Sequence, residues 1–383
     1  MKKIFIIILI ITIFLPKIVL GEDNLLKNAK SGILIDVDSG TIIYEKNIHD
    51  RLSVASMTKM MGMILIMEAL EEGKINLDEK VRVSKNASSM GGSQIWLEEN
   101  EEMTVNDLIK GIMMASANDG IVCMAERIGG TEEDFVKMMN KKAKELGLKD
   151  TNFVNSSGLD IDNHYSSAYD MSIIARELLK HEKILEYTSI YEDYLRKGTS
   201  KEYWLVNTNK LIKTYKGADG LKTGMTDNAG YCMAVTAIRN GMRLLAIVLG
   251  EESGKIRNLE TSELLDYGFN NYELETINKK GDVLGNIKID KANSENYPII
   301  ASKNVTILKK KGENKNNYRS DLKLNNLKIP IKKGSIIGEI IVLDDLGNQI
   351  NKTEVIINED IKKDSFINIF YKIVLSVIKG ELI

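Results

Sequence analysis

Three short patterns in the sequence combine side chains that could carry out nucleophilic catalysis. Ser-x-x-Lys occurs at Ser56 and Lys59, Ser-x-Asn at Ser116 and Asn118, and Lys-Thr-Gly at residues 222–224. A serine hydroxyl is a weak nucleophile that needs a neighbouring base. Because residues three apart on a helix share a face, Lys59 is expected beside Ser56. The patterns therefore predict transfer of an acyl group to a serine, with a lysine as the base.

A lysine acts as a base only in its neutral form, and the surroundings expected for Lys59 favour that form. It lies at the start of an apolar helix, and Lys222 provides a second lysine nearby. Burial and like charge both disfavour an ammonium group. The N-terminus of the same helix offers the backbone N–H of Ser56 as one donor of an oxyanion hole.

Each pattern is weak by itself, because the sequence repeats two of them elsewhere. Ser-x-x-Lys also begins at residues 320 and 376, and Ser-x-Asn at residues 84, 294 and 302. Taken singly, Ser56 could be a helix cap with a solvated lysine, Ser116 a loop hydroxyl and Asn118 a helix cap. Lys222 could be a solvated charge on a strand. These alternatives weaken together, because the three patterns follow one another in one order and each has a fitting context.

In this order the patterns resemble those of the penicillin-binding proteins and serine β-lactamases. Longer segments are similar to the serine D-alanyl-D-alanine carboxypeptidases, which are low-molecular-mass penicillin-binding proteins. The resemblance is dense over about residues 25–270 and looser beyond them. The segments that carry it are residues 52–59, 91–97, 114–119, 219–224, 229–232, 248–250 and 264–269.

The resemblance implies roles for the residues that carry out the reaction. Ser56 would be the nucleophile that accepts the acyl group, and Lys59 its base. Ser116 and Lys222 would relay the proton to the leaving D-alanine. Asn118 would hold the amide of the substrate.

It also implies how the substrate is bound. Thr223, between Lys222 and Gly224 in the Lys-Thr-Gly pattern, would bind the terminal carboxylate. Arg257 would share that carboxylate, a task that suits a guanidinium fork; the alternative is a surface charge on a helix. The backbone N–H of Met225 would be the second oxyanion donor.

Three functions from different classes compete for these residues. The first is a carboxypeptidase that removes the terminal D-alanine from peptidoglycan stem pentapeptides and is inhibited by β-lactams. The second is a β-lactamase, but the Glu-x-x-Leu-Asn pattern expected of a class A enzyme is absent between Ser116 and Lys222. The third is a peptidoglycan-binding module without catalysis, which would not need an intact Ser56, Lys59 and Lys222. Endopeptidase or transpeptidase activity is compatible with the same acyl-enzyme.

The elements that must position these residues predict an α+β fold. Strand patterns form a hairpin at 31–45 and further strands at 231–238 and 243–249. Helical patterns cover residues 56–70, 105–114, 119–128, 131–146, 168–181 and 255–267. With the resemblance, they predict a penicillin-binding-protein-like catalytic domain at 22–270, an antiparallel sheet with a helical cluster. Short alternating runs predict a small all-β domain, a β-sandwich, at 271–360.

The two ends of the chain carry signals for export and for a membrane surface. Residues 1–21 combine Lys2 and Lys3 with an apolar run, as in a signal peptide; an uncleaved anchor is the alternative. Residues 361–383 form a basic amphipathic pattern, which predicts a helix in a membrane interface; a helix packed on the protein's own core is the alternative. We therefore expect an exported protein held peripherally at the outer face of the cytoplasmic membrane.

Composition excludes several other classes. The chain has 383 residues and a formal net charge of −2, which argues against a nucleic-acid binder. Three histidines and two cysteines exclude a four-cysteine zinc site, and no metal or other cofactor is expected. We expect Cys123 and Cys232 to be free and buried. Two folded domains account for the length.

Overall fold

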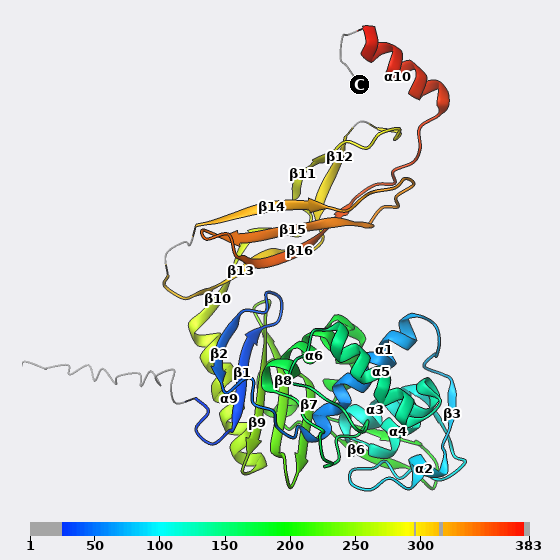
Figure 1. Cartoon of the computed structure of the whole chain (residues 1–383), viewed down its shortest axis with the longest axis vertical. Coiled ribbons are helices and arrows are strands. Elements are labelled where there is room, and N and C mark those ends of the chain that lie inside the picture. The colour runs from blue at the N-terminus through cyan, green and yellow to red at the C-terminus, as the bar shows by residue number, and fades with distance from the viewer. Residues whose placement is uncertain (1–24, 295, 314–316, 379–383) are drawn as a thin grey trace, which may run out of the picture.

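The computed structural model describes residues 25–294, 296–313 and 317–378. The predicted signal peptide at 1–21 lies outside these residues. Figure 1 shows a large part with mixed helices and strands, followed by a strand-rich part, with the last helix at the end remote from the large part.

A five-stranded antiparallel sheet forms the centre of the large part. Its strand order is β2-β1-β9-β8-β7, so the N-terminal hairpin lies beside the last strand of the sheet rather than beside β7. The predicted hairpins are confirmed. The strands are β1 (Ser31–Asp36), β2 (Ile42–Lys46), β7 (Ala218–Thr226), β8 (Gly230–Arg239) and β9 (Met242–Glu251).

Both faces of this sheet are covered, which explains why β9 is an almost unbroken apolar run. Leu245, Ile247 and Leu249 belong to the core on the face covered by α6, whereas Leu244 and Val248 belong to the core beneath α9. Successive strand residues point to opposite faces, so a strand buried on both sides needs apolar residues throughout.

Most of the helices form a cluster on one side of the sheet, and α9 covers the other (Figure 1). Thr104, Thr131, Ser167 and Ser253 cap α3, α5, α6 and α9 by accepting a backbone N–H of the first turn. The helices are α1 (Lys59–Glu71), α2 (Lys85–Ser88), α3 (Val105–Met114), α4 (Asn118–Gly129), α5 (Glu132–Glu145), α6 (Ala168–Lys180), α7 (Leu185–Thr188), α8 (Leu211–Thr214) and α9 (Gly254–Asn271).

Short elements complete the helical side. The 3₁₀ turns are η2 (Ala55–Thr58) and η3 (Glu182–Ile184), and two small hairpins are made by β3 (Lys80–Arg82) with β4 (Glu102–Thr104) and by β5 (Glu192–Leu195) with β6 (Tyr203–Val206). The helix predicted from residue 56 therefore differs at its start. Residues 55–58 form a tighter turn, in which Ala55 has a φ of 47°, and the α-helix begins at Lys59.

The strand-rich part has a two-stranded and a five-stranded sheet that share one apolar core, which includes Tyr297, Val305, Val342 and Val355. The order in the larger sheet is β11-β12-β16-β15-β14. The α+β fold class with a following all-β part is thus confirmed. The strands are β10 (Tyr272–Asn278) paired with β13 (Val305–Lys310), and β11 (Val283–Ile287), β12 (Tyr297–Ala301), β14 (Tyr318–Leu324), β15 (Ile336–Asp344) and β16 (Gln349–Ile357).

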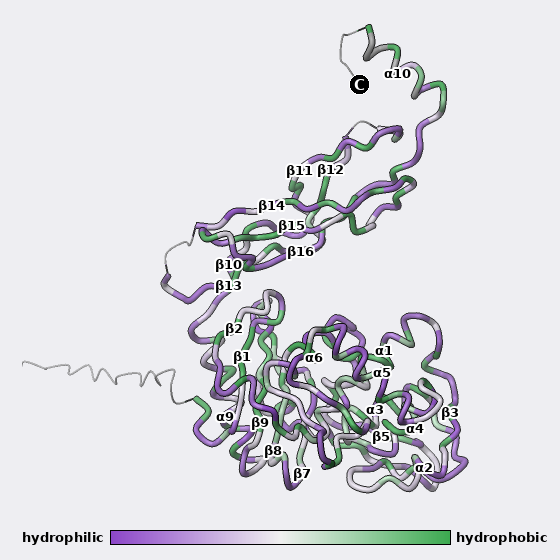
Figure 2. Tube along the Cα trace, in the orientation of Figure 1, coloured by the Kyte–Doolittle hydropathy of each residue, from purple (hydrophilic) through white to green (hydrophobic). Residues whose placement is uncertain are grey.

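The last described helix, α10 (Phe366–Ile378), presents apolar side chains to solvent. Phe366, Ile367 and Ile378 are 82%, 78% and 75% exposed. Figure 2 shows the hydrophobic colouring along this helix, apart from the rest of the protein. These exposures do not fit the alternative of a helix packed on the protein's own core. In the part of the chain that the structure describes, no helix has the length and apolarity needed to cross a membrane.

Candidate active site

Ser56 and Lys59 lie where the 3₁₀ turn meets α1, and their side chains are in contact. Lys59 Nζ is 2.7 Å from Ser56 Oγ, 2.7 Å from Asn118 Oδ1 and 2.7 Å from the carbonyl oxygen of Ser157. A neutral amine has two N–H groups and one lone pair. Because the amide and carbonyl oxygens can only accept, they occupy both N–H groups and leave the lone pair for the Ser56 O–H. The arrangement can therefore deprotonate Ser56.

The electrostatics favour that neutral amine. Lys59 is fully buried, and burial is the first cause that holds the pKa of its ammonium well below the usual lysine value. The charge of Lys222 lowers this pKa further, while Asp119 opposes the shift. The Ser56 side chain bonds Lys59 and provides no cap to α1, so its interpretation as a helix cap does not hold.

Asn118, the first residue of α4, is fixed from two sides. Its Oδ1 accepts from Lys59, and its Nδ2 donates to the carbonyl oxygen of Gly91 at 2.7 Å, which also settles the orientation of the amide. The neighbouring Gly92 has a φ of +79°, and a Cβ there would lie 2.7 Å from Asn118 Nδ2. Asp119 accepts the backbone N–H of Ile95 and so holds the same loop in place.

Ser116 lies between α3 and α4 with a φ of 64°. Its hydroxyl oxygen is buried and has no hydrogen-bond partner among the described atoms. Buried polar atoms are almost always paired, so an unpaired hydroxyl is a candidate functional group. No hydrogen bond in the described part of the fold uses it.

Lys222 and Thr223 lie on β7, the strand that contacts the 3₁₀ turn carrying Ser56. Lys222 is fully buried, and burial, followed by the charge of Arg257, lowers its pKa to about 7. Its Nζ donates to the carbonyl oxygen of Thr223 at 2.9 Å, and Thr223 Oγ1 donates to Thr208 Oγ1 at 2.8 Å. Arg257 on α9 is only 7% exposed, so it is not a surface charge.

Gly224 lets β7 approach the nucleophile. A Cβ at this position would lie 2.8 Å from the carbonyl oxygen of Val54 and 3.1 Å from Ser56 N. Any other residue would push the strand away from the turn. Met225 follows Gly224, so its backbone lies near Ser56 N, while its side chain is 56% exposed.

Comparison with known proteins decides the family. The family model described as D-alanyl-D-alanine carboxypeptidase matches residues 21–253, and the model described as penicillin-binding protein 5, C-terminal domain, matches residues 272–363. The chain belongs to the D-alanyl-D-alanine carboxypeptidase family. Among curated relatives of this carboxypeptidase, DacF of Bacillus subtilis is 49% identical, over 90% of this chain and 88% of its own. DacA of Escherichia coli is 32% identical, over 88% of this chain and 85% of its own.

Solved structures agree with this family. Penicillin-binding protein 5 of Haemophilus influenzae matches with a TM-score of 0.68 and 31% identity, over 88% of the carboxypeptidase chain and 98% of its own. Penicillin-binding protein D2 of Listeria monocytogenes, in its ampicillin-bound form, matches with a TM-score of 0.57 and 33% identity, over 63% of this chain and 97% of its own. The predicted serine carboxypeptidase is confirmed, and it is favoured over the β-lactamase and the module without catalysis.

The sequence did not predict that the loop at residues 155–164 forms one side of the carboxypeptidase site. Its Ser157 carbonyl accepts from Lys59, and Gly158, with a φ of +83°, packs so closely that a Cβ would lie 1.9 Å from Ala55 O. His164 joins the loop to the nucleophile turn at 2.8 Å from Thr58 Oγ1. Burial lowers the pKa of His164 to about 4, so its imidazole ring is uncharged at neutral pH and its contact with Thr58 is structural. Of these features, only Gly158 could have been noticed in the sequence, because a φ of +83° favours glycine. The contact at Ser157 is made by a backbone carbonyl, which no residue type marks.

The histidines, cysteines and acidic residues are the other candidates for metal or redox groups. In the described ranges, no three His, Cys, Asp or Glu side chains come together as metal ligands would. Cys123 and Cys232 are free and buried, as expected. Burial raises the pKa of Cys123 to about 12 and that of Cys232 to about 11, which disfavours reactive thiolates.

Proposed function

We propose that the chain removes the terminal D-alanine from peptidoglycan stem pentapeptides through an acyl-enzyme on Ser56. The observation that carries the proposal is the buried Lys59 amine, whose two other contacts, with Asn118 and Ser157, are to acceptors. Lys59 takes the Ser56 proton as Oγ attacks the carbonyl of the penultimate D-alanine. The bond to the terminal D-alanine then breaks, and water later hydrolyses the ester.

The proton must reach the leaving amine. The unpaired Ser116 hydroxyl and the Lys222 ammonium, with a pKa of about 7, are the groups proposed to relay it. The backbone N–H groups of Ser56 and Met225 stabilise the oxyanion, which the close approach at Gly224 makes possible.

The same site distinguishes the C-terminus of the substrate. Thr223 and Arg257 are proposed to bind the terminal carboxylate of the substrate. Lys222 and Gly224, on the same strand as Thr223, form the rest of this binding region. Asn118 is proposed to hold the substrate amide. The charge of Arg257 acts on Lys222, so a bound carboxylate would offset a positive field that this part of the site already has.

A β-lactam mimics the D-alanyl-D-alanine end and should acylate Ser56. Incubation with a D-Ala-D-Ala peptide and with a fluorescent penicillin tests the proposal. We expect release of D-alanine and a stable penicillin label. Rapid turnover of the lactam would instead favour a β-lactamase, and no labelling would favour a module without catalysis.

We also propose the organisation and location of the chain. Residues 1–21 are a cleaved signal peptide, 22–270 the catalytic domain, 271–360 a β-sandwich domain and 361–383 a membrane-anchoring tail that contains the amphipathic helix α10. The exposed apolar side chains of α10 support attachment to a membrane interface. The protein would then act peripherally at the outer face of the cytoplasmic membrane, where its peptidoglycan substrate is found.

Removing α10 and the residues after it, 366–383, should release the protein from membranes without changing its chemistry. We expect the truncated protein in the soluble fraction after cell fractionation, because the exposed face of α10 is lost. Its rate on a soluble peptide should match that of the full mature chain. Continued sedimentation with membranes would contradict the proposed attachment.

A further inference from the structure

The chain is held firmly just before α10 begins. Ile331 and Ile361 exchange backbone hydrogen bonds of 2.9 and 2.8 Å, and Asn293 N donates to the carbonyl oxygen of Lys362 at 3.0 Å. Asp364 N donates to the carbonyl oxygen of Lys291 at 2.8 Å. Three segments that are far apart in the sequence, at 288–293, 328–333 and 359–364, are therefore fixed together around the start of α10.

These three segments bring seven lysines to one end of the strand-rich part. All seven are exposed, and none forms an ion pair in the described part of the chain: Lys288, Lys291, Lys328, Lys332, Lys333, Lys362 and Lys363. The same segments contain four acidic residues: Asp290, Glu359, Asp360 and Asp364. Seven positive charges against four negative ones leave an excess of three, whereas the whole chain has a net charge of −2.

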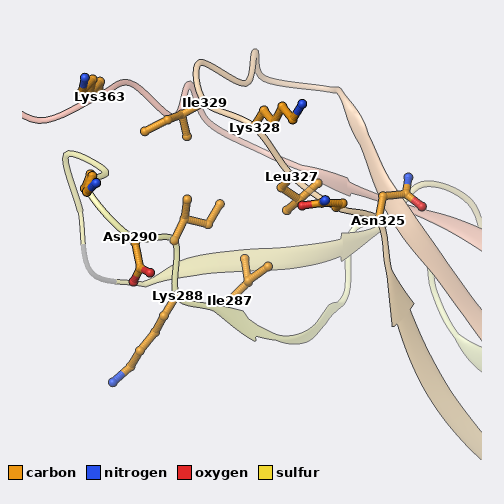
Figure 3. A pocket seen from close by; sticks show the side chains of 11 residues that line it. Ile287, Lys288, Asp290, Asn325, Leu327, Lys328, Ile329 and Lys363 are labelled. Carbon is orange, nitrogen blue, oxygen red and sulfur yellow. The ribbon is translucent and has the colours of Figure 1, made fainter. Parts of the chain in front are cut away.

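Four of the lysines line a pocket whose walls combine polar and apolar side chains. Its lining includes Lys291, Lys328 and Lys363, one carboxylate, Asp290, and the apolar side chains of Leu327 and Ile329. Figure 3 shows Lys328 and Lys363 on one side of this pocket, while Lys288 extends the opposite way. Figure 1 places this end of the strand-rich part beside α10 and away from the catalytic part, so the pocket is separate from the Ser56 site.

We propose that the lysines at the start of α10, with Lys291, Lys328 and Lys363 at their centre, bind the phosphate groups of anionic lipid headgroups. The inference rests on the membrane attachment proposed above. If α10 lies in the interface, the fixed backbone bonds place these ammonium groups at the headgroup level. The net positive charge of the three segments complements an anionic surface, and the apolar part of the lining, Leu327 and Ile329, suits the boundary between headgroups and acyl chains.

The lysines would then add selectivity to an attachment that the helix alone leaves weak. A short amphipathic helix binds by its buried apolar area, which does not distinguish lipid charge. Each lysine near an anionic surface strengthens binding about fivefold, and the effect decays within a Debye length. The attachment should therefore depend on the anionic lipid content and on salt.

Vesicle sedimentation with the chain from residue 22 to 383 tests this selectivity. Wild type should bind vesicles that contain a third phosphatidylglycerol more tightly than pure phosphatidylcholine vesicles. The variant Lys291→Gln, Lys328→Gln, Lys363→Gln should lose about 100-fold in affinity for the anionic vesicles, since three lysines each contribute about fivefold. Its binding to the neutral vesicles should not change.

A matched control replaces three exposed lysines of the catalytic part, Lys144, Lys149 and Lys255, with glutamine. It removes the same charge and should bind like wild type. Equal binding of the pocket variant and wild type to anionic vesicles would overturn the lysine proposal but leave the helix attachment intact. Failure of wild type to bind either vesicle would overturn both. Unchanged release of D-alanine from a soluble peptide verifies that the variants are folded.

Discussion

Replacing Ser56 with alanine should abolish release of D-alanine, with a loss in kcat on the order of 10⁶-fold, as for other nucleophilic serines. The substitution removes the hydroxyl that lies 2.7 Å from the Lys59 amine and leaves the surrounding packing in place. The fold should survive, because Ser56 is only half-buried and its hydroxyl otherwise makes one long contact of 3.5 Å, with Ser157 O. The checks are a D-alanine release assay and a melting curve.

The sequence offers a matched control for this substitution. Ser320 begins another Ser-x-x-Lys pattern, but it lies exposed on β14. Ser320→Ala should retain full activity. Substantial release of D-alanine by a folded Ser56→Ala protein would mean that another group is the nucleophile.

Replacing Lys59 with methionine should lower the rate of acylation on the order of 10⁴-fold, at the upper end of what a general base contributes. Methionine is unbranched and fills a similar apolar space, so the loss would come from chemistry rather than from a cavity. Stopped-flow acylation with a fluorescent penicillin measures the rate. Lys323→Met, in the exposed pattern on β14, is the control and should behave like wild type.

The pH dependence of the acylation rate in the wild type also tests whether Lys59 is the base. Lys59 must be neutral to accept the proton, and burial followed by the charge of Lys222 holds its pKa well below the usual lysine value. Acylation should therefore rise with pH through this lowered pKa and stop rising before the usual lysine range, and it should fall where the Lys222 ammonium, whose pKa is about 7, loses its proton. A rate that kept rising to the pKa of an ordinary exposed lysine would contradict the assignment of Lys59 as the base.

Periodicity and motif order predicted most of the elements and the residues of the site. Strand alternation and helical spacing are local properties, and the helices at 105–114 and 168–181 match α3 and α6 within a residue. The motifs identified Ser56, Lys59 and Asn118 because their chemistry resides in side chains. In the structure, Ser56 Oγ and Asn118 Oδ1 both contact the amine of Lys59.

The features that the sequence did not predict depend on backbone groups and on contacts between segments that are far apart in the chain. The Ser157 carbonyl and the close approach of Gly224 to Ser56 have no side chain to mark them. The tight turn at residues 55–58 depends on contacts with β7 and the 155–164 loop, so helical spacing alone extended α1 too far back. Likewise, alternation predicted an all-β domain at 271–360 but could not specify the strand order β11-β12-β16-β15-β14.

The central claim is that Ser56 accepts the acyl group, and peptide mapping of the penicillin adduct by mass spectrometry tests it most directly. After brief exposure to penicillin, we predict a single adduct, located on Ser56, with none on Ser116 or elsewhere. Ser56→Ala should carry no adduct under the same conditions. An adduct on any other residue of the wild type, or a stable adduct on the Ser56→Ala protein, would contradict the account.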